Sequence, residues 1–67
     1  ELLEEAYCRV QARVEPRTWE AFRLTALEGV SGAEAAARIG MAVATVFVAR
    51  GNVQRLLREE IRRLERE

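Results

Sequence analysis

Hydrophobic residues recur along the chain at the three- and four-residue spacing of an α-helix, in segments that proline and glycine separate. The first segment predicts a helix over about Leu2 to Arg13, with an apolar stripe of Leu3, Ala6, Tyr7, Val10 and Val14. Pro16 suits the first turn of a second helix, which Gly29 is expected to end as its C-terminal cap. The apolar residues of this second helix are Trp19, Phe22, Leu24 and Leu27, and the two aromatic side chains are expected in the core between the first helices.

Two more helices follow in the second half of the chain. Ser31 with Glu34 three residues later predicts a capping box, so a short helix is expected from Gly32 to Ile39. A last apolar stripe predicts a long helix from near Val43 to the end of the chain, through Val53, Leu56, Leu57, Ile61 and Leu64. Glycine inside a helix costs about 1 kcal/mol relative to alanine, so we expect Gly51 to mark a kink or a close approach. The whole pattern predicts an all-α domain of four helices.

The segment SGAEAAARIGMAVATVFVARG, residues 31–51, has the features of a helix-turn-helix. Ala35 and Ala36 are small enough for two helices to cross closely, and Gly40 tolerates the positive φ of a tight turn. Core positions are expected at Ile39 and Met41 beside the turn and at Val46 and Ala49 on the second helix. The outward face is then Ala42, Val43, Ala44, Phe47, Val48 and Gly51. The long C-terminal helix would be the recognition helix.

Length and composition limit the classes of function. A chain of 67 residues has room for one small core, and we expect no enzyme cleft in it. Ser31 is a helix cap without any histidine base, and one cysteine, Cys8, with no histidine offers neither an internal disulfide nor the usual zinc ligands. We therefore expect no metal and no cofactor.

The first residue and the hydropathy of the chain bear on whether it is part of a longer protein and where it is located. It begins at Glu1 rather than methionine, so residues 1–67 are expected to be one domain cut from a longer protein. Charges interrupt every apolar run, so we expect no signal peptide and no binding to a membrane. A cytoplasmic location is the expectation for such a chain.

Charge is balanced overall but unevenly distributed. All 11 basic residues are arginine, and 11 glutamates bring the net charge to zero, which argues against nucleic-acid binding by bulk electrostatics. The glutamates gather near the two ends, so the middle is relatively basic, and the planar guanidinium of arginine suits phosphate. In the last helix, Glu59 lies four residues from both Arg55 and Arg63, which predicts ion pairs on a solvated face.

The arrangement resembles region 4 of sigma-70-family sigma factors, most closely that of extracytoplasmic-function sigma factors. The resemblance extends over nearly the whole chain. Its matching segments are PRTWEAFRL at 16–24, GVSGAEAA at 29–36, IGM at 39–41, TV at 45–46 and VAR at 48–50.

This resemblance implies binding to the minus-35 element of promoter DNA, with other surfaces meeting the β-subunit flap of the RNA polymerase core. The base-facing positions would be Ala42, Val43, Ala44, Phe47 and Val48, and the phosphate-contacting ones Arg38, Thr45, Arg50 and Arg55. The chain departs from the family pattern at Ala42, where a serine cap is common, at Phe47, where a polar residue is frequent, and at Gly51-Asn52. Since residues 42–48 contain no Arg, Asn or Gln, specificity would depend on thymine methyl groups, DNA shape, and Arg50 or Asn52.

Other interpretations remain open at the level of sequence. In one interpretation, Phe47 fills a gap against a neighbouring helix or a dimer partner. In a second, the chain is a dimeric helix-turn-helix regulator whose last helix mediates self-association, so its DNA sites would be symmetric. In a third, the apolar face from Val43 to Val48 docks a protein such as an anti-sigma factor. Whether the isolated domain forms a homodimer is left open as well.

Overall fold

The chain folds into helices joined by short connections, and a computed structural model describes residues 1–66. The elements are α1 (Leu2–Arg13), α2 (Pro16–Phe22), the π-helical segment η1 (Arg23–Leu27), α3 (Gly32–Ile39) and α4 (Val43–Arg66). No strand occurs within residues 1–66. The predicted all-α domain with four helices is confirmed, as are the predicted bounds of α1 and α3.

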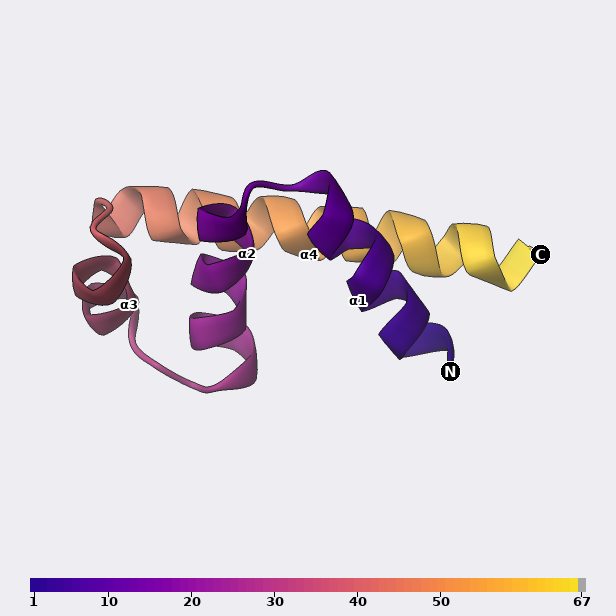
Figure 1. Cartoon of the computed structure of the whole chain (residues 1–67), viewed down its shortest axis with the longest axis horizontal. Coiled ribbons are helices and arrows are strands. Elements are labelled where there is room, and N and C mark those ends of the chain that lie inside the picture. Colours follow the sequence, from indigo (N-terminus) through magenta and orange to yellow (C-terminus); the bar gives the residue numbers. More distant parts are fainter. Residues whose placement is uncertain (67) are drawn as a thin grey trace.

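The long helix α4 organises the molecule. Its 24 residues correspond to about 36 Å of helix, which accounts for the longest dimension of 39 Å against 17 and 15 Å for the others. The other three helices pack along one side of α4, with α3 at its beginning, α2 next and α1 towards its end (Figure 1). Glu1 and the last described turn of α4 lie at the end of the molecule opposite α3 (Figure 1).

The hydrophobic core has two parts, and α2 contributes to both. Towards the C-terminal half of α4 the buried cluster is Ala6, Val10, Trp19, Phe22, Val53 and Leu57. Around the start of α4 it is Ala21, Leu24, Ala35, Ala36, Val46 and Ala49. Trp19 and Phe22 face one cluster while Ala21 and Leu24 face the other. The predicted burial of the two aromatic residues is confirmed, and their ring centroids lie 5.2 Å apart.

The second helix ends differently from the prediction. Instead of one α-helix up to Gly29, the chain widens into the π-helical turn η1, where the amide of Glu28 donates to the carbonyl of Arg23, five residues back. The hydroxyl of Thr25 donates to the carbonyl of Ala21 at 2.7 Å, the group that its own amide would use in an α-helix. Side-chain bonds of this kind compete with the α-helical hydrogen bond, and this one lies within the widened turn. Leu27, expected on the buried stripe, lies in this turn and is 48% exposed.

Glycines behave as expected at two positions and differently at a third. Gly29 and Gly40 both have positive φ, +74° and +81°, and end the helices before them. At Gly51 the expected close approach is absent, because a Cβ atom there would meet nothing within 4 Å, and α4 continues through this residue without interruption.

No single helix within residues 1–66 is both long and apolar enough to cross a membrane; α3 and α4 reach that length and composition only as a pair bent by 100°.

Candidate nucleic-acid interface

The candidate site is built on α3, the turn at residues 40–42 and the first turns of α4. Ser31 caps α3, because its hydroxyl accepts a hydrogen bond from the amide of Glu34 at 3.1 Å. The carboxylate of Glu34 accepts from Arg38 one turn later rather than completing the predicted capping box. At the other end of α3, Gly40 and Met41 both donate their amides to the carbonyl of Ala36. This closed turn sets a bend of 100° between α3 and α4.

Small side chains lie where α3 crosses α4. Ala35 is fully buried and Ala36 is 6% exposed, and both pack with Val46 and Ala49 of α4, as the sequence predicts. Ile39 and Met41 beside the turn are half-buried and pack against the same cluster. Because Val46 and Ala49 face this crossing, the opposite side of the first turns of α4 faces solvent.

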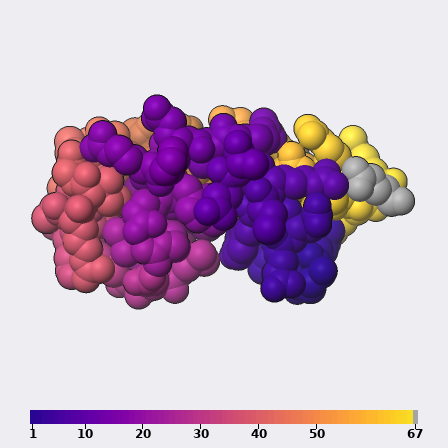
Figure 2. All heavy atoms as spheres, viewed as in Figure 1, coloured from indigo at the N-terminus to yellow at the C-terminus, as the bar shows by residue number. Residues whose placement is uncertain are grey.

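All five residues predicted to face DNA bases are exposed, Ala42 in the turn and the other four on the first turns of α4. Ala42 and Ala44 are exposed, and the larger side chains of Val43, Phe47 and Val48 are 43%, 53% and 62% exposed. These five residues are called the apolar face below. In Figure 2 α3 and the start of α4 together form one end of the molecule, and α1 (indigo) lies towards the other end.

Phe47 also contacts α3. A Cβ atom built on Gly32, the first residue of α3, would lie only 2.6 Å from the Cζ atom of the Phe47 ring and 2.9 Å from its Cε2 atom. The ring therefore rests directly on the backbone of Gly32, while about half of it remains exposed. Sequence reasoning assigned Gly32 only to the start of a helix, since nothing local indicates which side chain approaches it.

The four residues predicted to contact phosphate differ in what they contact. Arg38 is paired with Glu34, and Arg55 with Glu59 at 3.1 Å, both across one helical turn and both exposed. Thr45 is exposed, and Arg50 is half-buried and has no ion pair or side-chain hydrogen bond to any residue in 1–66. Exposed pairs of this kind contribute less than about 1 kcal/mol, so their guanidinium groups can exchange the carboxylate for a phosphate.

Further arginines share a side of α4 with Arg55. Residues 55, 58, 62 and 66 are three or four apart, the spacing that places side chains on one side of a helix, and all four are exposed arginines. This row of Arg55, Arg58, Arg62 and Arg66 is called the arginine ridge below. Sequence reasoning singled out only Arg55, although the spacing of the others was visible in the sequence.

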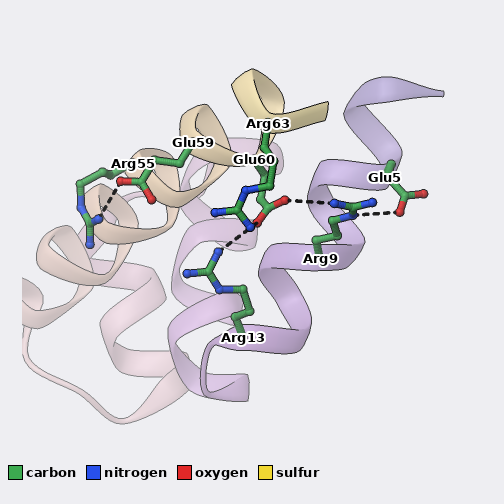
Figure 3. Close-up of polar contacts among 7 residues, drawn as sticks. All are labelled: Glu5, Arg9, Arg13, Arg55, Glu59, Glu60 and Arg63. Atoms are coloured by element: carbon green, nitrogen blue, oxygen red, sulfur yellow. Dashed lines mark hydrogen bonds and ion pairs between the residues drawn. The ribbon is translucent and has the colours of Figure 1, made fainter. Parts of the chain in front are cut away.

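A buried glutamate fastens α1 to α4. Glu60 is 2% exposed, and its carboxylate lies 3.0 Å from a guanidinium nitrogen of Arg13, 3.4 Å from one of Arg63 and 3.6 Å from one of Arg9 (Figure 3). The predicted pair between Glu59 and Arg63 is wrong: Arg63 pairs with Glu60, and Glu59 pairs with Arg55 (Figure 3). A buried charge is tolerated when oppositely charged groups lie beside it, and here three guanidinium groups surround one carboxylate.

A shallow pocket of about 430 Å³ lies between α2, η1 and α3. Its lining residues are Pro16, Arg17, Glu20, Arg23, Leu24, Glu28, Arg38 and Ile39. Arg17 donates to the carbonyl of Gly40 at 2.9 Å, and Arg23 pairs with Glu20 and Glu28. The hydrogen bonds from Arg23 hold the pKa of the Glu20 carboxyl below its ordinary value. These bonds fix the pocket walls and fasten α2 to the turn before α4.

Comparison of the chain with protein-family models, with curated proteins and with solved structures gives no match.

Proposed function

We propose that this chain is a DNA-binding domain in which α3 and α4 form a helix-turn-helix, and that it serves as region 4 of an extracytoplasmic-function sigma factor. The observation that supports this best is the α3–α4 unit itself: a capped helix, a glycine turn and a 100° bend lead into a helix whose first turns are exposed. Helix pairs at about 90–120° across a short turn are typical of DNA-binding helix-turn-helix units.

The start of α4 has the dimensions that the major groove requires. An α-helix with its side chains is about 10–12 Å wide and the groove is about 12 Å wide, so the first turns of α4 can enter it with the apolar face towards the bases. In this docking α3 lies across the phosphate backbone. Ala42 has no side-chain acceptor to cap α4, so the first amides of the helix remain available to a phosphate oxygen.

Phosphate contacts would come from cations beside this helix. Arg38, Thr45, Arg50 and Arg55 are the candidates. The other members of the arginine ridge lie further along α4, outside the groove. Because the net charge of the chain is zero, binding depends on this local arrangement rather than on the overall field. A moderate dependence of affinity on salt is therefore expected.

The resemblance to sigma factors supplies the rest of the proposal. The DNA would be the minus-35 element of promoters, and the protein partner the β flap of the RNA polymerase core, with an anti-sigma factor as a further partner. Such a domain acts in the cytoplasm and catalyses no reaction. Its role is to position the polymerase.

Arg50 offers the most direct test of DNA binding by mutation. We expect Arg50→Ala to weaken binding of the chain to its preferred duplex and to reduce the slope of log affinity against log salt by about one, since one phosphate contact is lost. Fluorescence anisotropy at several salt concentrations measures both quantities. Arg66→Ala is the matched control, because it removes the same charge roughly 24 Å further along α4. Equal losses for the two variants would show that Arg50 makes no specific contact.

Selection from a randomised duplex library at fixed salt tests the class of function. A short asymmetric motif supports the sigma-factor proposal, and a palindrome favours the dimeric regulator. The apolar face gives a specific reason for a second candidate, a protein-docking module, because large exposed hydrophobic side chains often mark protein contacts. Absence of any enriched sequence would favour that candidate.

A further inference from the structure

We infer that the apolar face of α4 distinguishes bases by the methyl group of thymine, an inference that rests on the proposed DNA-binding function. Among residues 42–49 only Thr45 has a side chain that can form hydrogen bonds. The face therefore lacks the paired donors and acceptors by which Arg, Asn or Gln identify guanine and adenine. What it presents instead is the exposed hydrocarbon of Val43, Phe47 and Val48.

Thymine is the one unmodified base with an apolar group in the major groove, the methyl at C5. Contact between this methyl and a valine or phenylalanine side chain removes apolar surface from water, which is favourable. The same side chains placed against a guanine, cytosine or adenine edge would displace water from polar atoms and replace none of its hydrogen bonds. The apolar face thus favours thymine and disfavours the other bases through the same contact.

Gly32 determines where the ring of Phe47 can lie. The ring rests on the backbone of Gly32, where a Cβ atom would be 2.6 Å from its Cζ atom. Any other residue at this position would push the ring away from α3 and alter its height above the bases. Gly32 is therefore a positioning residue that acts through Phe47.

The charges near the apolar face favour DNA over an apolar protein surface as its partner. Arg50, three residues after Phe47, is half-buried and makes no ion pair within residues 1–66, and the arginine ridge begins five residues later at Arg55, which pairs with Glu59. No glutamate lies between Glu34 and Glu59. Two of the guanidinium groups beside this hydrocarbon, those of Arg38 and Arg55, are in exposed ion pairs with Glu34 and Glu59, which a phosphate can replace. Hydrocarbon beside such guanidinium groups matches a row of methyl groups flanked by phosphates.

Replacement of thymine by deoxyuracil tests the inference, since it removes only the methyl group. A duplex enriched from the randomised library is synthesised again with each thymine replaced in turn, and affinity is measured by anisotropy at fixed salt. We expect roughly a fourfold loss for each methyl that contacts the face, from about 0.8 kcal/mol for a buried CH₂ group. Thymines outside the enriched motif serve as controls. Where a cytosine replaces a contacted thymine, 5-methylcytosine should recover part of the lost affinity.

Two variants test whether the preference for thymine over deoxyuracil depends on Val48 and Gly32. Val48→Thr replaces a methyl by a hydroxyl at a side chain that is 62% exposed, and the ratio of thymine to deoxyuracil affinity should fall towards one at the base it contacts. Gly32→Ala should lower the ratio at the base below Phe47, and circular dichroism of this variant checks that it remains folded. Equal affinity for thymine and deoxyuracil duplexes would overturn the inference and leave DNA binding standing. No binding to any duplex would overturn both.

Discussion

At the scale of single residues, the ion pair between Glu20 and Arg23 shows how one neighbour sets the position and the pKa of a charged side chain. Glu20 and Arg23 are one helical turn apart and are joined by two hydrogen bonds, one of 2.8 Å from the Nε atom of Arg23. Burial opposes the effect, yet these bonds hold the pKa of Glu20 below its ordinary 4.5. The same contact raises the pKa of Arg23. Both side chains remain more than a third exposed, so water screens their attraction.

This pair predicts a small pH dependence of stability. Because the pKa of Glu20 is lower in the folded chain than in the unfolded one, its contribution is complete above about pH 5 and is lost as the pH falls through the lowered value. Glu20→Gln should therefore lose less stability than the parent chain on acidification from about pH 5. Urea unfolding at a series of pH values measures the difference. Glu15→Gln, at an exposed glutamate without an ion pair within residues 1–66, should follow the parent curve.

At the scale of helices, local chemistry predicts bounds well and interruptions poorly. α1 and α3 have their predicted bounds because caps, prolines and glycines act over one turn of chain. The π-helical turn η1 depends on whether the hydroxyl of Thr25 bonds to the carbonyl of Ala21, and serine or threonine inside a helix is compatible with either outcome. Gly51 gives a sequence signal for a kink, but α4 packs on both core clusters and continues through this residue as one helix.

The glycines give opposite predictions for the same substitution. Gly51→Ala should stabilise the fold by about 1 kcal/mol, because the site is helical and open, and alanine is the better helix former. Gly40→Ala should destabilise it by roughly 1–2 kcal/mol, since a Cβ atom disfavours the φ of this turn. Thermal unfolding followed by circular dichroism measures both. A destabilising Gly51→Ala would mean that α4 bends at this residue in solution.

At the scale of the whole molecule, the feature that sequence reasoning missed is the burial of Glu60. The sequence shows a charged residue in a charge-rich tail, and its neighbour Glu59 looks equivalent. Only the packing of α1 on α4 distinguishes them, because it brings Arg9 and Arg13 from a distant part of the sequence to Glu60. The apolar face was predictable by contrast, since the periodicity of α4 and the burial of Val46 and Ala49 determine it within one helix.

Loss of the Glu60 charge should loosen α1. Glu60→Gln keeps the volume but weakens the contacts to three arginines, and we expect a loss of roughly 1–3 kcal/mol in the free energy of unfolding. The arginines are partly exposed and can turn to water, which limits the cost. Glu59→Gln, the matched control on the exposed side, should change stability by less than about 0.5 kcal/mol. Urea unfolding gives both values, and equal losses would contradict a special role for Glu60.

The position of the chain ends has a practical consequence. Glu1 and the last described turn of α4 lie on the side of the molecule away from α3 (Figure 1). A dye, a bead or the surface of a sensor chip attached through either end would leave α3 and the start of α4 facing the solution. Immobilised chains would therefore share one orientation. Each would present α3 and the start of α4 to a duplex in solution.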